Sequence, residues 1–225
     1  MRIPLYIDFS DKNVIIIGGG SVGTTRAKKF VRAGANVTVY SEKFTEDLLN
    51  LSREGKIKLV KTDVRNLNLE EVIKGAHLIV VAIGDKNYND KILNLAKNYK
   101  TLVNLANDAD RTEVVVPFEG GRDGIRFAVT TEGKSGIVAR EVRDRFQHIL
   151  ENDIETIHFL KAMDYVKRYM KSKDIPVNLR LQLYSIIGSD EEFRRLAMKG
   201  KIDEAIKRAE VIIEDYKNLR GEVEF

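Results

Sequence analysis

Short apolar runs alternate along the first half of the chain with segments whose apolar residues recur every three or four positions. The runs are typical of buried parallel strands, and the helical period is typical of amphipathic helices. The predicted strands are residues 13–18, 35–40, 57–60, 77–82 and 101–105, and the predicted helices between them are 24–33, 44–54, 69–74 and 89–98. Strands and helices that alternate with short links predict an α/β fold with a Rossmann-type doubly wound parallel sheet.

The pattern changes after residue 112. Strands are predicted at 113–118 and 125–130, joined by a turn-rich link at 119–124, and a helix is predicted to begin near Ile137. From about residue 153 onward the chain is predicted to be helical, with apolar stripes that are typical of core or partner contacts. The stripes are Phe159, Met163, Val166 and Met170, then Leu179, Leu183 and Ile186, then Ile202, Ile206, Ala209 and Ile213. We therefore predict three parts: 1–112, a small β/α region at 113–152, and a C-terminal helical domain at 153–225.

The composition narrows the chemistry. The chain has 225 residues, 43% of them hydrophobic and 32% charged, as in an ordinary globular protein. It has no Cys, which excludes disulfides, thiolate nucleophiles and cysteine-bound metal, and its three His are too widely spaced to predict a metal site. No apolar stretch resembles a signal peptide or approaches the ~20 residues of a membrane span, so we expect a cytoplasmic protein without a membrane partner.

Glycines follow the first predicted strand in the order G-x-G-x-x-G, formed by Gly18, Gly20 and Gly23. In a dinucleotide-binding unit the first glycine allows the tight turn, the second lets the backbone approach a pyrophosphate, and the third lets helix and strand pack closely. The N–H groups that begin the helix then face the phosphates. The motif lies between a strand and a helix within a β-α-β unit, which favours a dinucleotide over a purely structural glycine turn.

The second predicted strand does not end in the acidic residue that usually binds a ribose. Tyr40 and Ser41 occupy that place, followed by Glu42 and Lys43. Glu42 could reach a ribose hydroxyl and Lys43 could favour a 2′-phosphate, so NAD and NADP both remain open, with a preference for NAD. Ligands of such sheets bind beyond the carboxyl ends of the strands, which points to residues 18–23, 41–43, 82–85 and 104–108.

A polar segment, Thr130 to Gly136, leads into the helix predicted near Ile137. Hydroxyls and free N–H groups at a helix start can bind an anion. The alternative is that Ser135 simply caps the helix. Residues 1–150 hold 24 Lys and Arg against 19 Asp and Glu, a net charge of 24 − 19 = +5. No basic surface interleaved with aromatic residues is evident, so a nucleic-acid partner is not expected.

Several motifs together resemble one known family. They are Pro4-Leu5-Tyr6-Ile7-Asp8, the run from Val14 to Gly20, the segment from Ala33 to Val39, Val103-Asn104, and the segment from Thr130 to Ser135. In this order they resemble the precorrin-2 dehydrogenase/sirohydrochlorin ferrochelatase family, which is also the N-terminal module of siroheme synthase. The resemblance covers residues 1–150 well and the helical tail only in outline.

The resemblance implies NAD-dependent oxidation of precorrin-2 to sirohydrochlorin in siroheme biosynthesis, a porphyrin-type pathway. Some members then insert Fe(II), a second and separate activity. It also implies a homodimer whose subunits contact each other through the region from Val114 to Arg145, and a basic pocket for a polycarboxylate substrate. Candidate cations for that pocket are Arg111, Arg122, Arg126, Lys134, Arg140 and Arg143.

The glycine motif, the strand ends, the charges and the resemblance together give the expected site residues. The expected cofactor contacts are Gly18, Gly20, Ser21, Val22, Gly23, Ser41, Glu42 and Lys43, and the expected substrate contacts are Asn104, Thr130, Lys134 and Ser135. The family's Asn-x-x-Asp-Asp stretch reads here as Asn104 to Asp108, with Asn107 in place of its first Asp. Because an amide does not accept a proton as a base does, the catalytic role either moves to Asp108 or is weakened, and Fe(II) insertion stays open.

Two other classes remain. One is a different NAD(P)-dependent dehydrogenase on the same fold, although the chain offers neither a well-placed His nor a Tyr-x-x-x-Lys pair near residues 165–169. The other is a non-catalytic regulatory module that responds to NAD or a tetrapyrrole. Turnover of NAD with precorrin-2 distinguishes the enzyme from the module.

Overall fold

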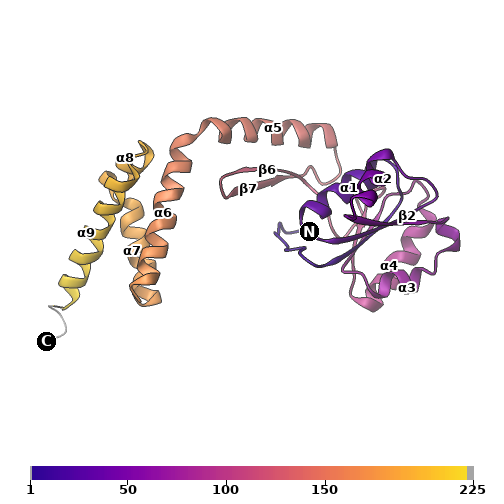
Figure 1. Cartoon of the computed structure of the whole chain (residues 1–225), viewed down its shortest axis with the longest axis horizontal. Helices are drawn as coiled ribbons and strands as arrows, with labels where there is room; N and C mark the ends of the chain where they lie inside the picture. The colour runs from indigo at the N-terminus through magenta and orange to yellow at the C-terminus, as the bar shows by residue number, and fades with distance from the viewer. Residues whose placement is uncertain (1, 222–225) are drawn as a thin grey trace. The chain divides into compact units, whose positions relative to one another are not determined.

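The structure is a computed structural model that describes residues 2–221. The chain divides into two units. The first comprises the residues up to Phe118 together with Thr130–Ala139, and the second comprises Glu119–Val129 together with the residues from Arg140 onward (Figure 1).

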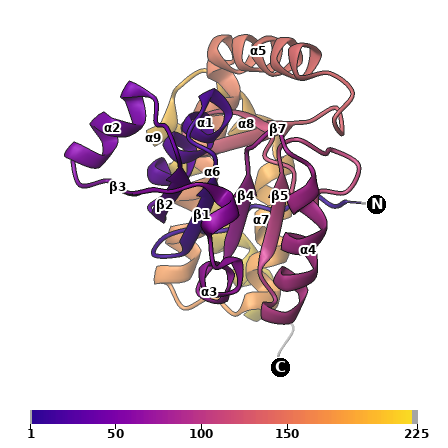
Figure 2. The ribbon, with the colours of Figure 1, turned by 90° about the vertical axis from the view of Figure 1, so that its right-hand side faces the viewer.

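The first unit contains a five-stranded sheet in which every strand pairs in parallel with its neighbours. Its order is β3-β2-β1-β4-β5 (Figure 2). The strands are β1 (Asn13–Ile17), β2 (Asn36–Ser41), β3 (Ile57–Lys61), β4 (Leu78–Val81) and β5 (Leu102–Leu105). The helices are α1 (Ser21–Arg32), α2 (Glu46–Arg53), α3 (Leu69–Lys74) and α4 (Asn87–Tyr99), with a short 3-10 turn, η1, at Val64–Asn66. The predicted doubly wound fold is confirmed.

Two apolar cores lie on the two faces of this sheet. Phe30 of α1 and Leu48 of α2 pack on one face, and Ile73 of α3 and Ile92 of α4 pack on the other. The central strands have apolar side chains on both faces, which is why their sequences read as continuous apolar runs. The chain order reverses between β1 and β4, and ligands of such sheets bind at that point, beyond the carboxyl ends of the strands.

The strand predicted at 113–118 is wrong. Only Phe118 belongs to a strand, because β6 (Phe118–Arg122) begins where the predicted strand ends. Residues 113–117 run without strand pairing, and Val114 and Val116 pack on the core instead. Their apolar character therefore reflects partial burial against the core of the sheet. The link predicted at 119–124 is mostly strand, and the turn is confined to Asp123 and Gly124.

The hairpin of β6 and β7 (Ile125–Val129) packs against α5 (Gly136–Asn152), as Figure 1 shows. Gln147 of α5 accepts a hydrogen bond from the Gly121 N–H at 2.9 Å, and Phe146 meets Phe127 edge to face. The strand predicted at 125–130 and the helix predicted near Ile137 are both confirmed. Alternate residues of β7 are exposed, as its alternating sequence predicts.

The C-terminal part of the second unit is helical, as predicted. It comprises α6 (Ile154–Ser172), α7 (Val177–Ser189), α8 (Glu191–Met198) and α9 (Ile202–Gly221). Most of the predicted apolar stripes form one buried core there. Ile186 is an exception, since its side chain is 42% exposed and Ile187 is buried in its place. The prediction placed the α7 stripe one residue too early at that point.

Asp190 holds three of these helices together. Its carboxylate accepts the Phe193 N–H at 2.7 Å as the N-cap of α8, and it also binds Arg208 of α9 through Nε at 3.1 Å and the second nitrogen at 2.6 Å. The Arg208 guanidinium keeps the pKa of Asp190 below its ordinary value. Asp190 also ends α7, so one side chain joins the ends of two helices to a third.

We expect Asp190→Ala to lower the free energy of unfolding by about 1–2 kcal/mol, because it removes a helix cap and leaves Arg208 without its partner. Urea denaturation followed by circular dichroism measures this change. Asp190→Asn keeps a capping oxygen and is expected to lose less. Equal losses in the two variants would show that the cap contributes little.

Candidate active site

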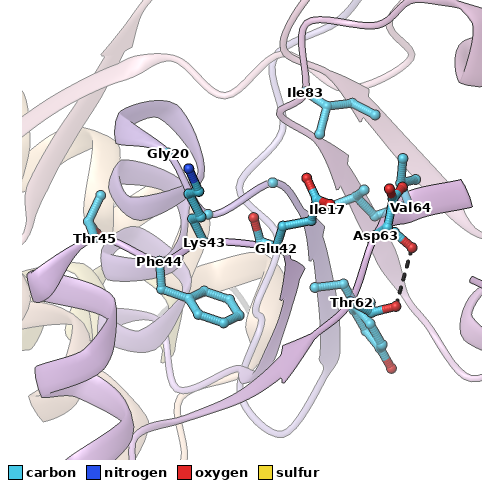
Figure 3. A pocket seen from close by; sticks show the side chains of 14 residues that line it. Ile17, Gly20, Glu42, Lys43, Phe44, Thr45, Thr62, Asp63, Val64 and Ile83 are labelled. Carbon is cyan, nitrogen blue, oxygen red and sulfur yellow. Dashed lines mark hydrogen bonds between the residues drawn. The ribbon is translucent and has the colours of Figure 1, made fainter. Parts of the chain in front are cut away.

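A cavity of about 490 Å³ lies at the carboxyl ends of β1, β2 and β3 (Figure 3). Its wall includes the glycine turn and the residues that follow β2 and β3. The lining residues are Ile17, Gly18, Gly19, Gly20, Tyr40, Ser41, Glu42, Lys43, Phe44, Thr45, Thr62, Asp63, Val64 and Ile83. Five of the eight predicted cofactor residues therefore line one cavity: Gly18, Gly20, Ser41, Glu42 and Lys43.

Two of the three motif glycines are required by the protein's own packing. Gly18 has φ +116°, and a Cβ added there would lie 2.4 Å from the Ala82 carbonyl oxygen. A Cβ on Gly23 would lie 1.9 Å from the Gly18 carbonyl oxygen, so α1 could not begin where it does. These two residues form the tight turn and the close helix contact that the sequence motif predicts.

Gly20 differs from them. It is the N-cap of α1, and a Cβ added there would meet no protein atom within 4 Å. The protein's packing therefore does not require glycine at this position. Glycine here leaves the backbone open to an approaching ligand, and the first N–H groups of α1 have no acceptor within the helix. The cavity and the open face of Gly20 together fit the pyrophosphate of a dinucleotide.

The residues after β2 line the cavity beside the glycine turn, and those after β3 line its other side. The side chain of Lys43 points toward Gly20 in Figure 3, while Asp63 and Val64 lie on the other side of the cavity. An ammonium group beside the turn suits a pyrophosphate. Ser21 and Val22, also predicted as cofactor contacts, are exposed in the first turn of α1 and do not line the cavity.

Asp63 was not among the site residues predicted from the sequence. It follows β3, and β3 pairs with β2 in the register Ser41 to Lys61. The Thr62 N–H donates to the Ser41 carbonyl at 3.0 Å, which brings the residues after the two strands to the same edge. The signal that could have found Asp63 was the adjacency of β2 and β3, since the carboxyl ends of neighbouring parallel strands meet.

The Asp63 carboxylate is held by Arg65. It accepts the Arg65 backbone N–H at 2.8 Å and the Arg65 Nε at 2.7 Å, and it forms an ion pair with the guanidinium. These hydrogen bonds lower the pKa of Asp63 to about 2, so the carboxylate is ionised at any physiological pH. Its side chain is only 15% exposed, whereas that of Arg65 is 75% exposed.

Asn107 contacts Ile83, which lines this cavity. Its amide nitrogen donates to the Ile83 carbonyl at 2.8 Å, and its amide oxygen accepts from the buried Asn89 at 3.1 Å. Both ends of the Asn107 amide are therefore engaged in joining the segments that follow β4 and β5. A carboxylate in its place would face the Ile83 carbonyl without a proton to donate, so the asparagine suits this position structurally.

Asp108 is an ion-paired carboxylate. It accepts the Arg111 Nε at 2.7 Å, and Arg111 also contacts Asp90 at 2.6 Å. The Arg111 guanidinium keeps the pKa of Asp108 below its ordinary value. The side chain of Asp108 is 12% exposed. It is therefore charged at neutral pH and is a weak base.

Asn104 lies inside the sheet and does not line the cavity. It is 3% exposed in β5, and its amide nitrogen donates to the Val114 carbonyl at 2.6 Å. Its amide oxygen is buried without a hydrogen-bond partner. Asn104 thus fixes the unpaired segment that includes Val114 against the edge of the sheet.

The predicted substrate residues around the start of α5 lie together in one turn. Ser135 Oγ accepts the Val138 N–H at 3.2 Å, which is a helix cap. Thr131 Oγ1 accepts the Ser135 N–H at 2.9 Å, and Thr130 Oγ1 accepts the Glu132 N–H at 3.1 Å. Thr130 and Lys134 are exposed. Of the two interpretations of Ser135, capping is observed, while anion binding stays a prediction.

A second cavity, of about 420 Å³, lies at the amino ends of the strands. Lys12, Lys74 and Lys100 line it, but Lys74 and Lys100 lie at the C-terminal ends of α3 and α4, where cations stabilise the helix. His77 Nδ1 accepts the Asn13 N–H at 3.1 Å. Lys74, Lys100 and His77 thus have structural explanations.

The chain resembles known proteins over most of its length. A family model described as "Putative NAD(P)-binding" matches residues 5–118. A protein of Methanocaldococcus jannaschii named "Putative precorrin-2 dehydrogenase" is 31% identical over 198 residues, which are 85% of this chain and 92% of that protein. A "Siroheme synthase" of Actinobacillus pleuropneumoniae is 22% identical over 98% of this chain, and the chain spans only 44% of that protein's length.

A solved structure titled "SirC, precorrin-2 dehydrogenase" has the same fold. It superposes with a TM-score of 0.68 over 93% of this chain and 99% of that chain, at 19% sequence identity. The likeness extends through the helical C-terminal part, which the sequence motifs covered only in outline. From the identity to the Methanocaldococcus jannaschii protein over nearly its whole length, together with the NAD(P)-binding match, the chain belongs to the precorrin-2 dehydrogenase family.

Proposed function

We propose that this protein oxidises precorrin-2 to sirohydrochlorin with NAD⁺ as the acceptor. The observation that carries the proposal is the open face of Gly20 in a glycine turn that lines a cavity at the carboxyl edge of the sheet. That geometry supports the binding of a dinucleotide, and the names of the relatives given above indicate the substrate. The substrate loses one hydride and one proton, so the reaction balances as a two-electron oxidation.

The bound nicotinamide would supply the hydride acceptor. The chain would hold the dinucleotide by its pyrophosphate, at the N–H groups that begin α1 and the Lys43 ammonium, and by its ribose, at Glu42. Gly18 and Gly23 support this site indirectly, since they allow the turn that places those N–H groups. Ile83 lines the cavity, and its carbonyl accepts a hydrogen bond from Asn107.

Asp108 is our candidate for the proton acceptor. Loss of a hydride leaves a cationic macrocycle whose N–H is acidic, so a weak base is sufficient to take the proton. Asp108 follows β5 at the carboxyl edge of the sheet, and its contacts with Arg111 keep it charged. Asn107 would position this segment through Ile83 and Asn89, and would not itself take the proton.

Thr130, Lys134 and Ser135 are our candidates for substrate contact. Precorrin-2 is a polycarboxylate, and the exposed Lys134 beside a turn of hydroxyl groups offers a charge and donors to a carboxylate. Asn104 is assigned no substrate contact, because it is buried in β5 and bonded to Val114.

The proposal is tested by turnover. Purified protein is incubated anaerobically with NAD⁺ and precorrin-2, and the spectra of NADH and sirohydrochlorin are followed together. We expect the two products to form in equal amounts. A protein that binds NAD⁺ but forms neither product would be the regulatory module considered above, and the proposal would fail.

Fe(II) insertion receives no support from the site geometry. Among residues 2–221, no group of three or more Asp, Glu or His side chains is arranged to hold a metal ion. Fe(II) insertion also needs a base for the pyrrole protons, and since the amide of Asn107 cannot act as one, that role would fall to Asp108. Our proposal covers the dehydrogenation, and adding Fe(II) to the same assay tests the second activity separately.

We further propose that the protein is a homodimer that contacts its second copy through α5. One face of this helix carries Val138, Val142, Phe146 and Ile149, of which Val138 is 48%, Phe146 50% and Ile149 62% exposed. Their spacing of three or four residues places them in one stripe. A contiguous exposed apolar stripe on a helix is typical of a protein–protein interface.

Ile149→Asp is expected to convert the dimer to a monomer, because it places an unpaired charge in that interface. Size-exclusion chromatography with light scattering measures the mass. His148→Asp introduces a carboxylate one residue away, outside the apolar stripe, and is expected to leave the dimer intact. A wild-type protein that is monomeric at micromolar concentration would contradict the proposal directly.

A further inference from the structure

The cavity at the carboxyl ends of β1, β2 and β3 has an acidic end. Glu42 and Asp63 follow two neighbouring strands, β2 and β3, and both line the cavity. Glu42 is close enough to Asp63 to interact with its carboxyl group. The usual ribose-binding carboxylate at the end of the second strand is absent here, since Tyr40 and Ser41 complete β2. One carboxylate of this end, Glu42, follows Ser41 directly in the chain. The other, Asp63, follows the neighbouring strand β3.

Neither Lys43 nor Arg65 offers a free positive charge to a ligand at the acidic end of the cavity. The ammonium group of Lys43 points toward Gly20, at the other end of the cavity (Figure 3). Arg65 is bound to Asp63 by its backbone N–H, its Nε and its terminal nitrogen. The guanidinium is thus neutralised by the same side chain that faces the cavity.

We propose that Asp63 makes the protein select NAD over NADP, by presenting a carboxylate at the ribose end of the cavity and by holding Arg65 away from a 2′-phosphate. The proposal deepens the proposed function, since it rests on dinucleotide binding in this cavity. Ribose hydroxyls donate hydrogen bonds to carboxylates, whereas a 2′-phosphate would face the Glu42 carboxylate and would have to compete with Asp63 for the Arg65 guanidinium. Specificity of this kind depends on the repulsive element as much as on the attractive one.

The low pKa of Asp63 makes the effect independent of pH in the physiological range, since the carboxylate stays charged. Arg65 is the second component. Arginine binds phosphate through paired N–H groups, so a released Arg65 would become a phosphate ligand at the same place. Neutralising Asp63 would then remove its repulsion of a 2′-phosphate and would also release Arg65 to bind that phosphate.

The test is nucleotide binding by isothermal titration calorimetry, with NAD⁺ and NADP⁺ titrated separately and no tetrapyrrole present. We expect wild-type protein to bind NAD⁺ at least about tenfold more tightly than NADP⁺. Asp63→Asn keeps an acceptor for the Arg65 backbone N–H and is expected to narrow that ratio by about tenfold or more. Asp63→Asn/Arg65→Gln is expected to lose much of the gained NADP⁺ affinity.

Asp47→Asn is the matched control. Asp47 is a carboxylate on α2 that pairs with Lys28, and it does not line the cavity. It is expected to leave the ratio unchanged. If Asp63→Asn keeps the wild-type ratio, or if wild-type protein binds both nucleotides equally, the inference fails while the proposed function stands. If wild-type protein binds neither nucleotide, the proposed function fails as well.

Discussion

Gly20→Ala is expected to weaken NAD⁺ binding by roughly 100-fold while leaving the melting temperature unchanged. Gly20 has φ −80° and ψ −168°, an extended conformation that alanine adopts freely. The new methyl group would meet no protein atom within 4 Å, so the fold has no reason to change. It would instead occupy the space through which a pyrophosphate approaches the backbone. Calorimetric titration with NAD⁺ and a thermal melt measure the two effects.

Gly75→Ala provides the control for this substitution. Gly75 ends α3 with φ −100°, and a Cβ added there also meets nothing within 4 Å. It lies at the amino end of the strands, beside the second cavity, so its methyl group would not affect the dinucleotide. Unchanged NAD⁺ affinity in Gly20→Ala would mean that the dinucleotide does not approach this turn.

The sequence predicted the centre of the sheet well because β1 and β4 are buried on both faces. A continuous apolar run and the glycine turn after it are local features, and they need no tertiary information. The segment 113–117 has the same local appearance, but it forms no ladder: its Glu113 and Val114 N–H groups both donate to the single Val103 carbonyl of β5. Val114 and Val116 are partly buried against the core, and only the tertiary structure distinguishes the two cases.

Site residues that lie within one local sequence motif could be predicted. Those that join the site only because two strands are neighbours in the sheet could not. The glycine turn and Glu42 follow directly from the β-α-β pattern. Asp63 becomes part of the cavity only because β3 lies beside β2. Likewise, the sequence identified Asp108 as a carboxylate at the right edge, but its partner Arg111 and the two contacts that hold Asn107 could be seen only in three dimensions.

The second large effect is expected from Asp108→Asn, which should lower kcat about 100-fold if this carboxylate accepts the substrate's proton. KM should change little, since the amide keeps the size of the side chain. Stopped-flow absorbance of NADH formation measures the rate, and a thermal melt shows whether the Arg111 contact affects folding. Asp110→Asn removes an exposed carboxylate two residues away and is expected to leave kcat unchanged.

The pH profile distinguishes a base from a merely structural carboxylate. Arg111 holds the pKa of Asp108 below its ordinary value, so the wild-type rate should fall only when the pH drops below the range of an ordinary aspartate. Arg111→Gln removes that stabilisation of the charged form, so the pKa rises and the acid limb should move to higher pH. A structural Asp108 would alter the melting temperature of this variant but would leave the acid limb in place. Asp108→Asn with wild-type kcat would assign the proton to water, and the charge of Asp108 would then serve only to hold the turn through Arg111.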